Sequence, residues 1–466
     1  VDVMDALGAN IRVDARGPDI LRILPRVHED VNEEWLGDRS RFSHDALKRR
    51  RLDRPWVKRD GRLRPATWPE AFEAIAARMK GVPGERVGAL AGDTNDAESL
   101  LALRDLMAAL GSCNLDCRGD GAAIDASRRD FYLFNSTVAG IDEADALLIV
   151  GSNPRLEAPV LNARIRKRWA RGNFPVAYVG PAGMDLTYSA THLGNGAGAL
   201  DAASDFAGVL RDAKRPMVIV GRTALARADG AAVLAAAWTL AREVGALSDD
   251  WHGFNLLHRF GGQVGALDLG FLPGEGGKDL AGMLGGGVDV LWLLAADALD
   301  TARIAPDTFV VYQGHHGDRA ASRADVILPG STYLEKDGLY VNTEGRVQVG
   351  RRAVFAPGEA REDWRILRAA SEVHGHRRPY DDPTQIRAAL AAANPVFASV
   401  DRVATPRCAD TAGPSAQGTA LSDAAFGVPV EDYYLADPIS RASEVMAECS
   451  RTRAEGGDAP MRLAAE

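Results

Sequence analysis

Two adjacent histidines and two nearby glutamates are the side chains of this sequence best suited to chemistry. His315 and His316 follow an apolar run at 309–312. A histidine pair at a strand end can act as an acid and a base or bind a metal, but a metal needs at least one more ligand and no nearby residue supplies it. Structural hydrogen bonding is the alternative. Glu335 and Glu344 can form a carboxylate pair, although both lie in a loop of unknown geometry.

Both glutamates belong to the stretch Ala324–Gln348, around which the chain is organised. It opens with an apolar run at 326–328 that a Pro-Gly turn ends, and a polar segment follows. Open α/β sheets place a ligand crevice where such a segment leaves a strand. The other interpretation is a loop that only packs against the sheet, in which Asn342, Glu344 and Arg346 hydrogen-bond one another.

The four cysteines, Cys113, Cys117, Cys408 and Cys449, are too few for a disulfide scaffold and favour a reducing compartment. Cys113 and Cys117 can contact a metal, but two ligands do not complete a site. The sequence has no G-x-G-x-x-G fingerprint, phosphate-binding loop, nucleophile elbow or zinc helix motif. It therefore assigns no catalytic, cofactor-binding or metal-binding residue.

Strand, glycine turn and helix recur along the chain, as in a parallel sheet. Thr67 and Glu70 have the spacing of a capping box at a helix start. Uniformly apolar strands are buried on both faces, which predicts a doubly wound α/β assembly. Its turns can hold a phosphate, although most such turns are plain connections. We expect strands at 86–91, 146–150, 176–179, 217–220, 288–294 and 309–312, with helices at 96–110, 161–169 and 230–244.

The composition is that of a globular protein with a large core, since 46% of the 466 residues are hydrophobic and 26% are charged. A net charge of −9 makes a broad nucleic-acid face unlikely. No apolar run reaches the roughly 18 residues of a membrane span. The first residues form neither a signal peptide nor a basic presequence and include no initiator Met, so we expect a longer protein.

Two charged runs near the N-terminus and one glycine-rich segment stand out in the sequence. The acidic run 28–34 and the basic run 48–51 predict solvated faces or one ion-pair network, with a docking edge for another subunit as the alternative. The segment Gly261–Gly287 predicts a long surface loop.

We expect four regions. They are a small β-rich domain at 1–56, an α/β domain at 57–120 and 205–350, an inserted α/β domain at 121–204, and a helical C-terminal extension at 351–466 that is flexible at 401–425.

Several rare strings give the chain a family resemblance. The helix at Trp68, the string GSNPRLEAP at 151–159 and the stretch Ala324–Gln348 together resemble the molybdopterin oxidoreductase superfamily, the fold of formate dehydrogenases. More narrowly, the chain is similar nearly end to end to the large iron–sulfur subunits of respiratory complex I. That similarity is carried by the strings at 23–26, 28–30, 32–35, 312–318, 340–346 and 437–443.

The resemblance also implies what this stretch lacks. In that family an N-terminal region carries one [2Fe–2S] and two [4Fe–4S] clusters, and this chain resembles the part that follows it. Active members place a cluster cysteine after an Asn-x-x-x-Leu run, but here Asn32–Leu36 is followed by Gly37. They also place a metal-ligating Cys, selenocysteine or Ser a few residues past the segment of Cys117, whereas no cysteine occurs at 118–407. The resemblance implies a remnant crevice, closed by side chains, and no cofactor in this stretch.

We therefore expect a non-catalytic, structural region of the iron–sulfur subunit of NADH:quinone oxidoreductase, which supports electron transfer from NADH to quinone. One alternative is an active pterin–molybdenum or tungsten enzyme such as a formate dehydrogenase, and another is a soluble assembly protein. The implied partners are other peripheral-arm subunits, including the NADH/FMN-binding and quinone-module subunits, without nucleic acid or direct membrane insertion. The implied location is the cytoplasmic face of a bacterial inner membrane, or the matrix side of the mitochondrial one.

Overall fold

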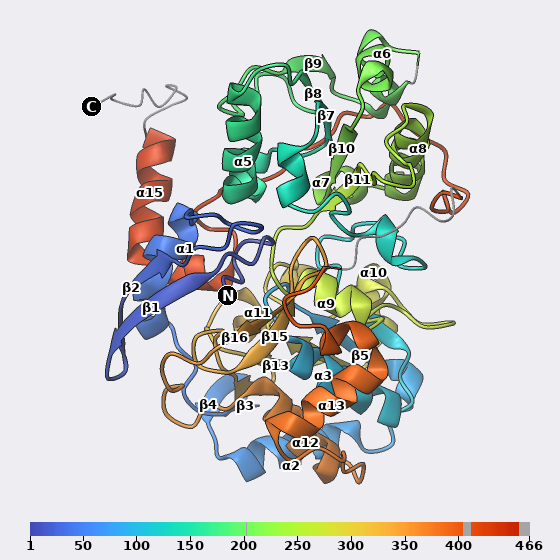
Figure 1. Cartoon of the computed structure of the whole chain (residues 1–466). Helices are drawn as coiled ribbons and strands as arrows, with labels where there is room; N and C mark the ends of the chain where they lie inside the picture. The colour runs from blue at the N-terminus through green and yellow to red at the C-terminus, as the bar shows by residue number, and fades with distance from the viewer. Residues whose placement is uncertain (202, 404–411, 456–466) are drawn as a thin grey trace.

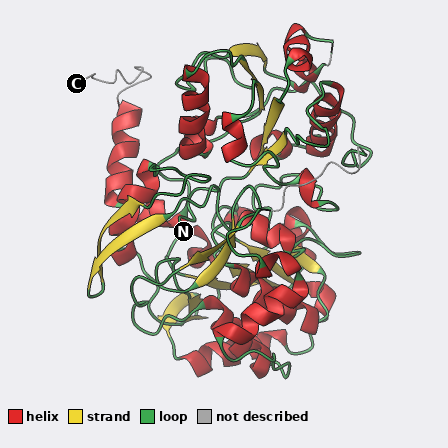
Figure 2. Ribbon diagram, viewed as in Figure 1, coloured by secondary structure: helices red, strands yellow, loops and turns green. Residues whose placement is uncertain are grey.

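The computed structural model describes residues 1–201, 203–403 and 412–455. Two α/β bodies, one above the other in Figure 1, make up most of the molecule. A two-stranded hairpin and the last helix lie beside them at the left of the view. Figure 2 shows that helices flank the strands of both bodies. The expected α/β, doubly wound class is confirmed.

The lower body is built on a seven-stranded sheet whose central strands are apolar and buried. Thr67 begins α2 with the predicted capping box, since its hydroxyl accepts from Glu70 N and its own N–H donates to the Glu70 carboxylate at 2.8 Å. The strands, in sheet order, are β4 (Arg62–Pro65), β3 (Trp56–Arg59), β14 (Val326–Pro329), β13 (Phe309–Gly314), β12 (Val290–Leu294), β5 (Val87–Ala91) and β6 (Asn114–Asp116). The helices are α2 (Trp68–Met79), α3 (Ala97–Ala109), α9 (Gln263–Asp268), α10 (Leu280–Gly282), α11 (Arg319–Arg323), α12 (Asp363–Val373) and α13 (Pro383–Ala393).

The upper body is built on a five-stranded parallel sheet. Its strands, in sheet order, are β11 (Phe254–Leu257), β10 (Pro216–Gly221), β7 (Ala146–Val150), β8 (Val176–Val179) and β9 (Thr191–Gly194). Its helices are α4 (Pro154–Glu157), α5 (Pro159–Ala170), α6 (Asp205–Asp212), α7 (Arg222–Leu225) and α8 (Gly230–Glu243).

This pairing corrects one expected domain boundary. Strands β10 and β11 fall within 205–350, the range expected to form one domain with the larger sheet, but β10 pairs with β7 of the upper body and β11 pairs with β10. Ile219 lies between Ile149 on one side and Asn255 on the other. A strand that is apolar on both faces fits either sheet, so its own residues do not specify its neighbours.

The N-terminal region is less β-rich than expected. It has one antiparallel hairpin, β1 (Ile11–Arg16) and β2 (Asp19–Pro25), followed by α1 (Asp38–Phe42). A second hairpin, β15 (Gly338–Val341) with β16 (Val347–Gly350), belongs to the stretch after β14. Short 3-10 helices connect these elements: η1 (Ser43–Lys48), η2 (Gly84–Arg86), η3 (Arg129–Phe131), η4 (Ala139–Asp142), η5 (Ala197–Leu200), η7 (Thr301–Arg303) and η8 (Pro395–Ala398), with one π turn, η6 (Met283–Gly287).

The acidic and basic runs near the N-terminus do not pair with each other. In the acidic run, Glu33 forms an ion pair with Lys167 of α5. In the basic run, Arg51 binds Glu335 through two hydrogen bonds of 2.5 and 2.6 Å. The runs therefore tie the N-terminal region to each α/β body separately.

Two further expectations concern the later chain. The segment Gly261–Gly287 is not a surface loop throughout, because α9 is buried along its whole length. The extension expected to be helical ends in two helices, α14 (Pro438–Ala442) and α15 (Glu444–Glu455). Among the described residues, no helix is both long enough and apolar enough to cross a bilayer.

Candidate functional site

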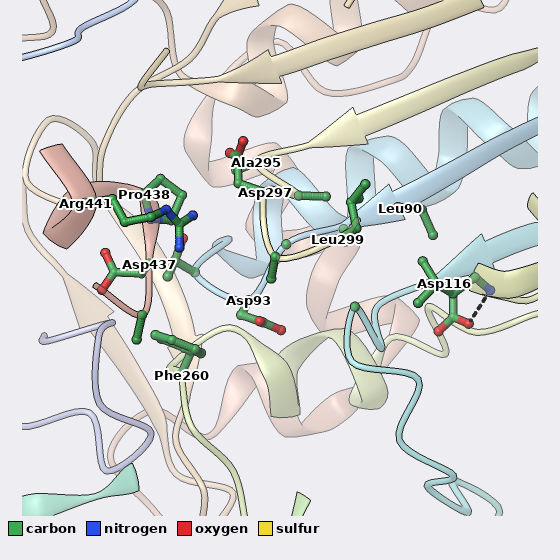
Figure 3. A pocket seen from close by; sticks show the side chains of 18 residues that line it. Leu90, Asp93, Asp116, Phe260, Ala295, Asp297, Leu299, Asp437, Pro438 and Arg441 are labelled. Carbon is green, nitrogen blue, oxygen red and sulfur yellow. Dashed lines mark hydrogen bonds between the residues drawn. The ribbon is translucent and has the colours of Figure 1, made fainter. Parts of the chain in front are cut away.

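The lower sheet has a topological switch point between β5 and β12. These strands are neighbours and run parallel, but the chain leaves β5 towards β6 and leaves β12 towards β13 on the other side. The two connections diverge beyond the carboxyl ends of the strands, and ligands of open α/β sheets bind in the crevice this creates. The crevice here lies between the turns 91–94 and 295–299 (Figure 3).

Little space remains in this switch-point crevice. Its cavity measures about 30 Å³, room for about one water molecule, whereas small-molecule sites measure roughly 300–1,000 Å³. Phe260 fills one side, and Ala436, Asp437, Pro438 and Arg441 from the C-terminal end of the chain fill another (Figure 3). The crevice exists, but the protein's own residues occupy it.

The lining of the crevice is acidic. Asp93, Asp116, Asp297 and Asp437 contribute carboxylates, and Arg441 contributes a cation. Burial raises the pKa of Asp93, and it raises that of Asp297 to about 6. An anionic ligand such as a diphosphate would meet like charges here, which disfavours its binding.

A second polar cluster extends from the lower body to the carboxyl end of β10 in the upper body. Arg222, at the start of α7, is buried and contacts both oxygens of Asp120 at 2.9 and 2.6 Å. Burial alone would raise the pKa of Asp120, but the Arg222 guanidinium lowers it to about 2. A bidentate pair of this kind is strong and fixes its geometry. The guanidinium is therefore already committed to an internal carboxylate.

His258 completes this cluster as a neutral ring. Its Nε2 lies 2.7 Å from the carbonyl oxygen of Tyr132, so we assign the ring proton to Nε2. Nδ1 then carries a lone pair, and this atom lies 3.5 Å from Arg222 Nη1. Burial and the Arg222 charge lower the pKa of His258 to about 3. The ring supports the arginine and stays uncharged over the physiological pH range.

Arg259 and Glu157 form a second ion pair beside the cluster of Arg222 and His258. Arg259 Nε donates to Glu157 at 3.0 Å, and the other oxygen of Glu157 accepts from the Ser152 hydroxyl at 2.5 Å. Arg222 and Arg259 are thus both neutralised by carboxylates of the chain itself. We did not predict these residues. Their positions in the sequence could have identified them, because Arg222 and Ser152 directly follow the glycine turns of apolar strands.

The histidine pair lies in the interior, away from this crevice lining. His315 Nδ1 and His316 Nδ1 are 2.6 Å apart, and His316 Nε2 lies 3.0 Å from the carbonyl oxygen of Ala46. His316 therefore donates through Nε2 and accepts from His315 through Nδ1. Burial lowers the pKa of both rings, that of His316 to about 3. These are the hydrogen bonds of the structural alternative.

Glu335 and Glu344 do not face each other as an acid–base pair. Glu335 binds Arg51, as described above, and Glu344 binds Arg346 at 2.8 Å and the N–H of Val138 at 2.8 Å. Asn342 donates to Glu344 at 3.3 Å, so the expected bonding among Asn342, Glu344 and Arg346 is present. Each glutamate is satisfied by its own partners.

The stretch Ala324–Gln348 is a junction and not the wall of an open crevice. Its hairpin is buried and bonds to both the N-terminal region and the upper body. Thr343 N donates to Ala6 O at 2.7 Å, and Thr343 O accepts from Phe134 N at 2.8 Å. Gln348 Nε2 donates to Gly8 O at 2.8 Å. The interpretation as a packed loop holds for this stretch.

The cysteines do not converge. Cys113 is exposed, whereas Cys117 is buried and its pKa is raised to about 12 by burial. Cys449 is half-buried on α15, and Cys408 lies outside the described residues. In the described part of the chain no group of three or more His, Cys, Asp or Glu side chains could hold a metal ion.

Comparison with known proteins identifies the family. Residues 51–373 match the family model "Molybdopterin oxidoreductase". Residues 1–45 match "NADH-ubiquinone oxidoreductase NDSU1/NuoG-like, 4Fe-4S domain". Residues 402–449 match the model of the C-terminal region of the same NuoG-like component of NADH-ubiquinone oxidoreductase.

Curated relatives agree over nearly the whole chain. The mitochondrial NADH dehydrogenase [ubiquinone] iron-sulfur protein 1 of Solanum tuberosum is 41% identical over 97% of this chain and 61% of its own length. The mitochondrial 78 kDa subunit of NADH-ubiquinone oxidoreductase of Neurospora crassa is 41% identical over 98% and 62%. The 75 kDa subunit of Reclinomonas americana is 38% identical over 97% and 67%. This chain thus spans about three fifths of the length of the first two relatives.

Solved structures share the fold. Acetylene hydratase from Pelobacter acetylenicus superposes with a TM-score of 0.62 at 14% identity, over 80% of this chain and 69% of that one. A chain of the formyltransferase/hydrolase complex from Methylorubrum extorquens gives 0.53 at 20% identity, over 69% and 99%. At these identities the likeness concerns the fold alone.

The residues present do not fit the cofactors that these family names suggest. The crevice is filled and acidic, which suits neither the size nor the charge of a pterin dinucleotide. Residues 1–45 contain no cysteine to ligate a cluster. A Cβ placed on Gly37 would lie 3.1 Å from Pro159 Cγ and 3.1 Å from the Tyr433 hydroxyl, so its surroundings are closed.

The family match over 51–373 and the end-to-end relatives lead to one conclusion. The chain belongs to the molybdopterin oxidoreductase family, among the 75/78 kDa iron–sulfur subunits of NADH-ubiquinone oxidoreductase.

Proposed function

We propose that these 466 residues are a structural, non-catalytic region of the electron-transfer subunit of an NADH:quinone oxidoreductase. The observation that carries the proposal is the crevice, which has kept the fold of a cofactor site but is filled by Phe260 and residues 436–441. The iron–sulfur clusters to which the relatives' names refer would lie outside this stretch. The region supports electron transfer by holding its neighbours in place.

The internal ion pairs support a scaffold role. Arg222 and Arg259 lie beside the glycine turn that ends β10, and each is neutralised by a carboxylate of the same chain. A catalytic site needs groups left free for its substrate, whereas a scaffold satisfies its buried charges internally. The arrangement favours rigidity over turnover.

The relatives support a proposal for the partners and the location of this chain. The proposed partners are other peripheral-arm subunits of complex I, including those that bind NADH and FMN and those of the quinone module. The proposed location is the cytoplasmic face of a bacterial inner membrane, with the mitochondrial matrix side as the alternative. Large apolar side chains that remain exposed, Trp35 (53%) and Phe355 (76%), are available for such contacts.

Metal analysis of the assembled complex tests this proposal. The chain carrying an affinity tag is purified from membranes, and molybdenum, tungsten and iron are quantified alongside NADH:quinone activity. We expect the chain in an active complex that contains iron but neither molybdenum nor tungsten in stoichiometric amount. Stoichiometric molybdenum or tungsten would support a working pterin enzyme instead. Absence of the chain from the active complex would favour an assembly protein.

A further inference from the structure

The end of the chain returns to the middle of the molecule. Residues 412–442, here called the C-terminal strap, pass along the upper body and then cross to the N-terminal region (Figure 1). Phe426 N donates to Asn195 O at 2.7 Å at the edge of the upper sheet. Further on, Pro429 O accepts from Arg259 and Thr223. The strap then enters the switch-point crevice at Ala436.

The short helix α14 is fixed on two sides. Asp437 caps it by accepting from the N–H groups of Ile439 and Ser440 at 2.9 and 3.0 Å. Ile439 and Ala442 pack in the apolar cluster of the N-terminal region, with Ile23 and neighbouring residues. The opposite side of this helix carries Arg441 towards the crevice (Figure 3).

Arg441 places a cation in the lining of the crevice, and its direct partner is Asp318. Its Nε and Nη2 both lie 2.7 Å from Asp318 Oδ2, and the side chains of the pair are 14% and 12% exposed. Asp297, buried close to the Asp318–Arg441 pair, is held by the Tyr312 hydroxyl and by Ala320 N. A partly desolvated guanidinium among several carboxylates is recognised more strongly than an exposed one, because water screens the attraction less.

We propose that the switch-point crevice is a binding site for this chain's own segment Ala436–Arg441, and that the Arg441 guanidinium is the group it recognises. The strap takes the place of a diffusible ligand, and its charge is opposite to that of a phosphate-bearing cofactor. Where the segment is displaced, the site accepts a small guanidinium compound. This proposal goes beyond the scaffold role and does not depend on assembly with other subunits.

Hydrogen–deuterium exchange on the full chain tests the recognition. The variant Arg441→Gln removes the cation and keeps most of the volume. Arg451→Gln is the matched control, because Arg451 is exposed on α15 of the same extension. We expect exchange in peptides covering 436–441 and 295–299 to rise at least about tenfold in Arg441→Gln. The control should leave both peptides unchanged.

Chemical rescue makes the test specific. Added methylguanidine at millimolar concentration should restore protection of 295–299 in Arg441→Ala, whereas methylammonium should restore much less. If Arg441→Ala does not fold, Arg441→Lys serves, with a smaller rise in exchange because a single ammonium replaces the planar fork. Unchanged exchange in 295–299 for every Arg441 variant, or an equal rise in the Arg451 control, would overturn the proposal. Because this experiment uses the isolated chain, its outcome does not depend on the result of the metal analysis of the assembled complex.

Discussion

Lys336 provides the sharpest test of the junction formed by Ala324–Gln348. Its ammonium lies 2.6 Å from Asp96 and 2.8 Å from Asp363, and all three side chains are at most 4% exposed. Burial alone would raise the pKa of Asp96, but Lys336 and the Ser99 hydroxyl reverse this and lower it. Both buried carboxylates therefore share this ammonium as a direct partner.

Replacing Lys336 by Met should destabilise this region by about 3–5 kcal/mol, the usual effect of breaking a buried ion pair from one side. The Asp96 carboxylate would then be buried without its cation, so its pKa should rise. A raised pKa in the folded state contributes stability that is present at low pH and lost as pH rises. We therefore expect the defect to be largest near pH 8 and to shrink towards pH 5.

Native-state hydrogen exchange is the suitable assay, because a chain of several bodies need not unfold in two states. Amides of β15 and of the first turn of α3 should exchange roughly 200- to 5,000-fold faster in Lys336→Met at pH 8, as about 3–5 kcal/mol implies. Lys48→Met is the matched control. Lys48 also lies 2.8 Å from an aspartate, Asp19, but that pair is largely exposed and should matter little. A rise below tenfold, or a defect equal at pH 5 and pH 8, would refute the reasoning.

The crevice yields two further predictions. The pKa of Asp297 is raised to about 6, so its contribution to stability is complete below about pH 4 and falls by up to about 3 kcal/mol as pH rises through 6. The variant Asp297→Asn does not titrate and can keep a hydrogen bond to Tyr312. Its thermal midpoint relative to wild type should therefore rise between pH 4.5 and pH 7.5. An unchanged difference would contradict this. Gly92→Ala should cost about 1–3 kcal/mol of local stability, measured by native-state hydrogen exchange, because its Cβ would overlap the carbonyl oxygen of Ala295. Gly119→Ala, in the same crevice with no atom within 4 Å, should be near neutral.

Local patterns in the sequence determined most of the elements. The expected apolar runs are strands β5, β7, β8, β10, β12 and β13 in the structure. The Thr67–Glu70 pair caps α2 as predicted, and Asp437 caps α14, of which Pro438 is the first residue. Such features depend on residues a few positions apart, so the sequence contains all the information they need. The rare strings that marked the family are also local, which is why a resemblance could identify the fold.

Only the tertiary structure decided how these elements are used. The pairing of β10 with β7, the pair Arg222–Asp120 and the filling of the crevice by 436–441 all join residues about 70 to more than 340 positions apart. The residues of an apolar strand do not specify which sheet it joins, and an aspartate does not specify which arginine will neutralise it. Those choices depend on the packing of the whole chain, since buried charges must find partners wherever the fold brings them together.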